Sequence, residues 1–142
     1  MRKKIMILMV LMFSVLSLQS MAAQPIKEVE KTIVLAYQDL VGKEYKMISP
    51  FGGNKITLGF DVQNRIYGYT GLNRFWGQAE IENGKVKVGE VFTTENKGVQ
   101  EQRILQVKYL TILKDVESIH FEGENLVLTT PFQEKLVFQP IL

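Results

Sequence analysis

Beyond residue 44 the chain is dominated by alternation of apolar and polar residues, the spacing typical of half-buried β-strands. The longest alternating run extends from Arg74 to Glu82 and ends at Asn83-Gly84. An Asn-Gly pair between two alternating runs predicts a tight β-hairpin, because both central residues of that turn need positive φ. By the same criteria we expect strands at residues 44–48, 56–60, 65–70, 74–82, 86–88, 91–92, 118–121, 126–129 and 136–138.

Two stretches follow the helical period instead. Residues 23–40 predict an amphipathic helix, with Pro25 in its first turn and Gly42 after its end. A second helix is expected within residues 93–114, where apolar residues again recur at three- and four-residue steps. The apolar stripes of the two helices are Ile26, Val29, Ile33, Tyr37 and Leu40, and Leu105, Tyr109, Ile112, Leu113 and Val116.

These elements predict an α+β fold that is mainly β. We expect a small antiparallel, barrel-like curved sheet of about eight strands, with one inserted helix and an N-terminal helix. Closing such a sheet removes the exposed strand edges that would otherwise pair with other chains. No linker divides the chain, so residues 41–142 are expected to form one domain.

The first residues have the pattern of a secretory signal. A basic start, residues 1–4, precedes an apolar run of about 14 residues and then small residues suited to cleavage after Ala22. The alternative is a retained membrane anchor, but so short a run does not span roughly 30 Å of hydrocarbon. We therefore predict a signal peptide at residues 1–22 and an exported protein, periplasmic or secreted, with no stable membrane span after cleavage.

Charge and cysteine content narrow the function classes. Three of the 17 Lys and Arg residues lie in the predicted signal, so the remainder nearly balance the 15 Asp and Glu residues. With no basic cluster left, the sequence does not predict nucleic-acid binding. The absence of cysteine excludes thiol nucleophiles, thiolate metal sites and disulfides.

The order of landmarks resembles the META domain, the HslJ-like family of small exported bacterial proteins. The resemblance covers roughly residues 39–140, and its most specific part is the Gly-x-Asn-Arg-x-x-Gly run of residues 71–77. It rests on Leu40-Val41-Gly42, Tyr45, Ile56-Thr57-Leu58-Gly59-Phe60, Arg65-Ile66-Tyr67-Gly68, Gly71-Leu72-Asn73-Arg74-Phe75-Trp76-Gly77, Thr93-Thr94, Tyr109-Leu110, Leu113, Ile119-His120-Phe121-Glu122-Gly123, Leu126, Leu128 and Leu136-Val137-Phe138-Gln139-Pro140.

The resemblance implies a small barrel-like domain in the bacterial envelope. In some members it implies a part in the heat-shock response and in novobiocin resistance, without established catalysis. The chain departs from the family at two places: Leu72 stands where a Cys is common, and Asn96-Lys97-Gly98 where a Met-Ala-Cys run is common. A redox or disulfide role is therefore not carried over.

The candidate binding residues lie around the glycine-rich segment: Tyr67, Tyr69, Asn73, Arg74 and Trp76. Arg74 offers a planar fork to a carboxylate or a peptide carbonyl, and Trp76 with the two tyrosines would form an apolar patch. The structural alternative gives Asn73 a left-handed turn position, pairs Arg74 with a nearby Glu, and packs Trp76 beneath the N-terminal helix. Residues expected to serve turns are Gly68, Gly71, Gly77, Asn83 and Gly84.

No catalytic constellation is predicted. His120 is the only histidine and lies two residues from Ser118, but no nucleophile-elbow sequence accompanies it, so a solvated surface histidine is the plainer interpretation. The carboxylate pairs Glu80/Glu82 and Glu122/Glu124 lack a recognised ligand spacing, and no glycine loop precedes a helix as a phosphate site would require. We expect no enzyme activity, metal or cofactor.

Two functions from different classes remain as hypotheses. The first is a non-catalytic envelope domain that binds protein partners or supports tolerance of envelope stress. The alternative is a barrel that binds a small apolar ligand in a pocket with aromatic walls.

Overall fold

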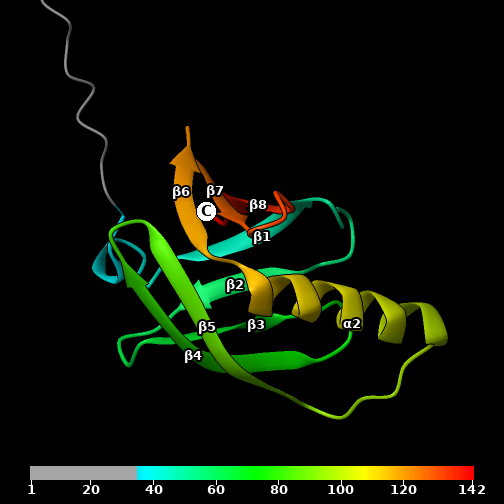
Figure 1. Ribbon diagram of the computed structural model, residues 1–142. Helices are drawn as coiled ribbons and strands as arrows, with labels where there is room; N and C mark the ends of the chain where they lie inside the picture. The colour runs from blue at the N-terminus through cyan, green and yellow to red at the C-terminus, as the bar shows by residue number, and fades with distance from the viewer. Residues whose placement is uncertain (1–34) are drawn as a thin grey trace, which may run out of the picture. The chain divides into compact units, whose positions relative to one another are not determined.

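The computed structural model describes residues 35–142, and these residues form eight β-strands, one short 3-10 helix and one α-helix (Figure 1). The signal peptide expected at residues 1–22 lies outside the described residues. The elements are η1 (Tyr37–Asp39), β1 (Glu44–Ser49), β2 (Thr57–Phe60), β3 (Arg65–Tyr69), β4 (Arg74–Glu82), β5 (Lys85–Thr93), α2 (Gln100–Asp115), β6 (Ser118–Glu122), β7 (Asn125–Thr129) and β8 (Lys135–Pro140).

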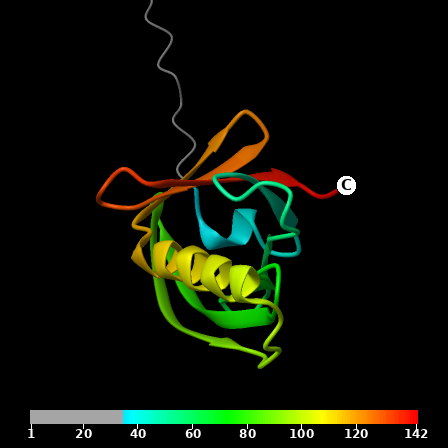
Figure 2. The ribbon, with the colours of Figure 1, turned by 90° about the vertical axis from the view of Figure 1, so that its right-hand side faces the viewer.

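The strands form a ring-like antiparallel sheet in which each strand pairs with its neighbours in sequence. The ring closes where β1 pairs with β8, from Tyr45 opposite Pro140 to Ser49 opposite Val137. The joint between β5 and β6 is the thinnest, with Lys85 opposite Ser118 as its one registered pair. The helix α2 connects these two strands and lies across one side of the ring (Figures 1 and 2). The prediction of a mainly β fold of about eight antiparallel strands with one inserted helix is confirmed.

The interior of the ring is filled by the protein's own side chains. Alternation is strictest on β4, where every second residue from Phe75 to Ile81 is buried. Tyr109 of α2 enters this core and meets Phe75 edge-to-face, with ring centroids 5.8 Å apart. The largest fully buried side chains are Tyr109, Phe60, Phe75, Phe138, Leu40, Ile56, Leu58, Leu113, Ile119, Leu126, Leu128 and Leu136.

The prediction of a helix at residues 23–40 is wrong for residues 35–40, the part of it that the structure describes. Residues 35–40 contain only the 3-10 helix η1, held by Leu40 N–H donating to the Tyr37 carbonyl and by the Ala36 N–H donating to the Asp39 carboxylate. The apolar spacing that suggested a longer helix has another cause. Leu35, Tyr37 and Leu40 are buried in the core of the ring as a short anchor, and the earlier part of that predicted helix lies outside the described residues.

The structure defines two other element boundaries. The separate strand expected at 91–92 is the end of β5, because a bulge opposite residues 77–79 of β4 interrupts the alternation without ending the pairing. The helix expected within residues 93–114, whose start the pattern left open, extends from Gln100 to Asp115. Gly98 takes φ +49° just before it, and Gln102 accepts a hydrogen bond from the Val99 N–H, which fixes the helix start there.

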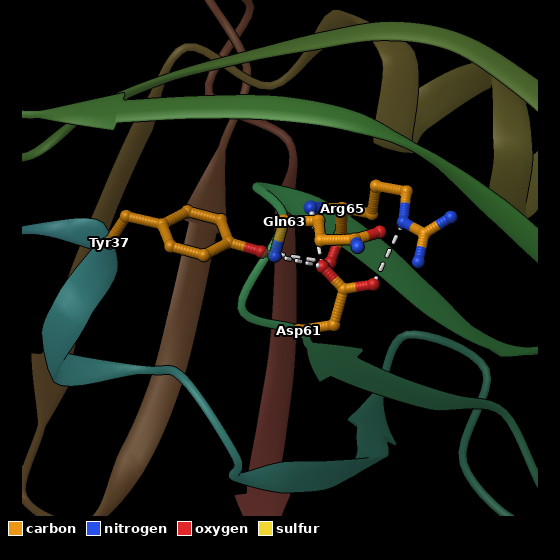
Figure 3. Close-up of polar contacts among 4 residues, drawn as sticks. All are labelled: Tyr37, Asp61, Gln63 and Arg65. Atoms are coloured by element: carbon orange, nitrogen blue, oxygen red, sulfur yellow. Dashed lines mark hydrogen bonds and ion pairs between the residues drawn. The ribbon is translucent and has the colours of Figure 1, made fainter.

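The turn between β2 and β3 is organised by Asp61 (Figure 3). Its Oδ1 accepts hydrogen bonds from the N–H groups of Gln63 and Arg65 at 2.8 and 3.0 Å, and its Oδ2 pairs with Arg65 Nε at 2.9 Å. Tyr37 donates its hydroxyl to the Arg65 carbonyl at 2.8 Å, so η1 is tied to the same turn. Burial, and next the nearby Asp61 carboxylate, raise the pKa of Tyr37 to about 12. This cluster is structural, because its polar groups bond to one another.

Candidate functional site

Three aromatic residues lie in register across neighbouring strands on the outer surface of the ring. Tyr67 of β3 is directly opposite Trp76 of β4, which is directly opposite Phe92 of β5. In the next row Tyr69 of β3 is opposite Arg74 of β4. We call Tyr67, Tyr69, Arg74, Trp76 and Phe92 the outer patch. It brings together four of the five predicted binding residues on one sheet surface.

The exposed centre of the outer patch is a stacked pair. Trp76 and Phe92 have ring centroids 6.3 Å apart and an interplanar angle of 22°. They keep 42% and 49% of their surface exposed, although each is large and apolar. Trp76 therefore stacks on its cross-strand neighbour on the surface, and the expectation that it is packed away beneath a helix is wrong.

Phe92 was missed by the sequence analysis, and the bulge is the reason. A regular hairpin counted outward from Asn83-Gly84 places Val91 opposite Trp76. The bulge adds one residue to β5 and brings Phe92 to that position instead. The available signal was the spacing of the inward-facing valines, since Val88 and Val91 are three residues apart rather than two.

A groove adjoins the aromatic row on the side of β1 and β2. Its volume is about 460 Å³, it is open to solvent, and its lining includes Glu44, Gly59, Tyr67, Tyr69 and Arg74. Tyr67 lies over Gly59, because a Cβ at that glycine would be 2.4 Å from the Tyr67 ring. This position lets the Tyr67 hydroxyl donate to Glu44 Oε1 at 3.0 Å. Burial, and then the hydrogen bond to this carboxylate, raise the pKa of Tyr67.

Arg74 is the charged member of the outer patch. Its backbone is held in place, with its N–H donating to Thr94 Oγ1 at 3.1 Å and its carbonyl accepting from the Thr94 N–H at 3.0 Å. Its side chain is exposed. Among residues 35–142 the guanidinium has neither an ion pair nor a hydrogen bond, so the Glu partner suggested as a structural alternative is absent there.

Asn73, the fifth predicted binding residue, is not on the surface. It is 2% exposed, and its Oδ1 accepts hydrogen bonds from Thr94 Oγ1 at 2.9 Å and from the Asn96 N–H at 2.7 Å. Its Nδ2 donates to the Asn96 carbonyl and to Gln106 Oε1, both at 3.1 Å. The side chain thus joins the β3–β4 turn to the segment after β5 and to α2, and it supports the outer patch without facing a ligand.

The left-handed position in the β3–β4 turn belongs to Gly71, with φ +89°, and not to Asn73. Thr70 completes the turn, since its Oγ1 accepts from the Asn73 N–H at 3.0 Å and its hydroxyl lies 2.8 Å from Gln106 Oε1. Leu72 is buried against the chain before α2, where a Cβ on Gly98 would lie 2.4 Å from Leu72 Cδ1. An apolar contact therefore joins the two segments in which the resembling family often carries cysteines.

The remaining predicted turn residues separate into two groups. Asn83 and Gly84 have φ +52° and +72° and connect β4 to β5. Gly68 and Gly77 lie within strands, where the absence of a side chain lets the neighbouring backbone approach closely. A Cβ at Gly68 would be 2.1 Å from the Thr57 carbonyl oxygen, and one at Gly77 would be 2.7 Å from that of Glu90.

The other titratable residues do not assemble a reactive site in the described part of the chain. His120 is exposed, with Nε2 3.1 Å from Glu122 Oε1, and this contact lowers the pKa of Glu122. Within residues 35–142 no three His, Cys, Asp or Glu side chains gather closely enough to hold a metal ion. None of the helices described there has the length and apolar character needed to cross a bilayer.

Comparison with known proteins gives a family and a fold. The family model described as META domain matches residues 36–141, while no curated protein matches the chain. An NMR structure of a protein from Burkholderia xenovorans is similar, with a TM-score of 0.60, 17% identity, and coverage of 83% of this chain and 99% of that one. A second NMR structure has a TM-score of 0.59 and 19% identity, covering 74% of this chain and 94% of its own.

Proposed function

The chain belongs to the META domain family, and from the outer patch we propose that it is a non-catalytic exported domain that binds a protein partner and supports tolerance of envelope stress. The single observation that carries the proposal is the surface row of half-buried Tyr67 and exposed Trp76 and Phe92, with Arg74 beside it. The export and the stress role rest on the sequence of the first 22 residues and on the family resemblance.

The composition of the outer patch favours a protein partner. Tyr, Trp and Arg are the residues that most often carry binding energy at protein interfaces, because each combines a large contact area with a directed polar group. The Trp76–Phe92 stack leaves two large rings half in water, which costs free energy that a covering surface would recover.

The patch is also pre-organised. The Thr94 and Asn73 hydrogen bonds hold the start of β4 in place, and the sheet register fixes the spacing of the rings. A partner therefore orders few groups when it binds, which reduces the entropic cost of association.

Affinity capture from an envelope fraction tests this proposal. We expect wild type and Gln78→Ala to retain the same partner, and Trp76→Ala and Arg74→Ala to lose or weaken it. Gln78 is a matched control because it is exposed on the same surface of β4, outside the patch. Identical partner sets for all four proteins, or no partner for wild type, would overturn the proposal.

The proposed stress role is tested in cells. A strain that lacks the protein should survive heat shock less well, and wild type and Gln78→Ala should restore survival where Trp76→Ala does not. Full restoration of survival by Trp76→Ala would show that a stress role does not depend on the outer patch.

A small-molecule binder is the second candidate, and the open groove beside Tyr67 and Tyr69 favours it. A ligand inside the ring is not proposed, because core side chains fill that space. Screening an apolar compound set by chemical shift perturbation would distinguish the candidates. Specific shifts confined to the groove residues would favour a small ligand over a protein.

A further inference from the structure

The arginines of the described residues differ in how their guanidinium groups are used. Arg65 pairs with Asp61, and Arg103 donates to the carbonyls of Lys97 and Gly98 at 2.7 and 2.9 Å. Arg74 alone among the three makes no such contact within residues 35–142, although its backbone is fixed on both sides by Thr94. An exposed guanidinium with no hydrogen-bond or ion-pair partner within residues 35–142 is therefore present on this surface, on a backbone that Thr94 holds in place.

The surroundings of Arg74 are aromatic. Tyr69 lies opposite it on β3, and Trp76 follows it two residues later on the same face of β4. A partner that covers these rings would exclude water from around the guanidinium. An ion pair formed there would be stronger than one on an open surface, because the local dielectric falls.

The groove beside Arg74 is lined by one acidic residue. Glu44 lines the same groove as Arg74, and its carboxylate accepts the Tyr67 hydroxyl at 3.0 Å. Arg74 is the one charged residue among the five of the outer patch, and it has no ion pair within residues 35–142. The group that matches a guanidinium best in charge and planarity is a carboxylate, which accepts two parallel hydrogen bonds from it.

We infer that the partner of the outer patch is a polypeptide segment with an acidic side chain next to an aromatic or aliphatic one. The carboxylate pairs with Arg74 and the apolar side chain covers Trp76 and Phe92. This inference rests on the proposed function and specifies the chemistry of the partner.

Selection from a displayed random peptide library tests the inference, and the natural partner need not be identified for it. The purified protein would be used as wild type, Arg74→Gln, Arg74→Lys, Trp76→Ala and Lys87→Gln. Lys87 is a matched control, since it is an exposed cation on β5 outside the patch. Trp76 is the only tryptophan of the chain, so its emission reports directly on whether a selected peptide covers the patch.

We expect wild type and Lys87→Gln to select peptides that combine an acidic residue with an apolar neighbour. Synthetic copies should shift Trp76 emission to shorter wavelength. Arg74→Gln should bind them about three- to tenfold more weakly, and raised salt should reduce wild-type binding by a similar factor. Arg74→Lys should recover only part of the loss, since a lysine lacks the planar fork.

Two results would overturn different claims. Peptides that shift Trp76 emission but show no acidic enrichment, and bind Arg74→Gln as well as wild type, would overturn the carboxylate inference and leave the binding role of the patch intact. Peptides that leave Trp76 emission unchanged and bind Trp76→Ala normally, or no selected peptides at all, would overturn the proposed function itself.

Discussion

At the scale of single residues, Asn73 shows how a polar residue in a family motif serves structure. Each of its amide atoms bonds to two groups, from the segment after β5 and from α2. A buried amide with all its bonds made stabilises, whereas removing it leaves several partners unpaired. The motif residue next to it, Arg74, faces outward instead.

Replacing Asn73 by Ala should lower the free energy of unfolding by about 2–4 kcal/mol, because the Thr94 hydroxyl, the Asn96 backbone and Gln106 lose a shared partner. Denaturant titration followed by circular dichroism measures this. Asn96→Ala is the control, since only the backbone of Asn96 takes part. Equal stabilities of the two variants would show that the network contributes little.

For Tyr109 we expect that removing a buried polar group does not destabilise the fold. Its hydroxyl is fully buried and has no hydrogen-bond partner in the described part of the chain. Tyr109→Phe keeps the ring against Phe75 and removes the unpaired group, so the unfolding free energy should stay within about 0.5 kcal/mol or rise by about 1 kcal/mol. Thermal denaturation would reveal a loss above that margin, which would mean that the hydroxyl is bonded in solution.

At the scale of elements, the alternating pattern predicted most strands because each has one face in the core. Asn83-Gly84 correctly predicted the β4–β5 hairpin, because both residues take the positive φ that the tight turn needs. The pattern could not predict the β5 bulge, since an extra residue changes the register and not the composition. It also could not predict the Asn73 network, whose partners are more than 20 residues away along the chain. Phe92 was missed for the first of these reasons.

Strand glycines give a test at this scale. Gly68→Ala should cost about 2–4 kcal/mol, because the new Cβ would meet the Thr57 carbonyl oxygen at 2.1 Å and the Phe75 ring at 2.9 Å, where β2, β3 and β4 are paired. Gly89→Ala is the matched control on β5, since its nearest atom would be at an ordinary 3.5 Å. Chemical denaturation of both variants measures the difference. Similar losses would mean that the β2–β3 contact is less tight than described.

At the scale of the whole molecule, the turn that joins β2 to β3 is predicted to contribute to the pH dependence of stability. Partial burial of the Asp61 carboxyl opposes its ionisation, but hydrogen bonds from the Gln63 and Arg65 N–H groups and from the Arg65 guanidinium outweigh it and lower the pKa of Asp61. A lowered pKa means that the carboxylate stabilises the fold above the pKa it has in the unfolded chain. That contribution disappears as the pH falls through the folded value.

The fall in unfolding free energy between pH 5 and pH 2 should therefore be smaller for Asp61→Asn than for wild type. Denaturant titrations at a series of pH values measure this slope. Glu122, whose pKa is also lowered, contributes in the same direction, so Glu122→Gln serves as the comparison. A slope that Asp61→Asn leaves unchanged would assign acid sensitivity to other carboxyl groups.

The seam between β1 and β8 has a consequence for how the ring assembles. Most other strand pairs join neighbours separated by short turns, but this one joins residues about 95 positions apart, such as Tyr45 and Pro140. Closing a loop of that length costs about 4 kcal/mol of chain entropy, which earlier pairings must already have offset. The β1–β8 pairing should accordingly form after the hairpin pairings. Until β1 pairs with β8, the sheet is open and has two unpaired edge strands. At this stage the protein is most prone to pair with another copy of itself.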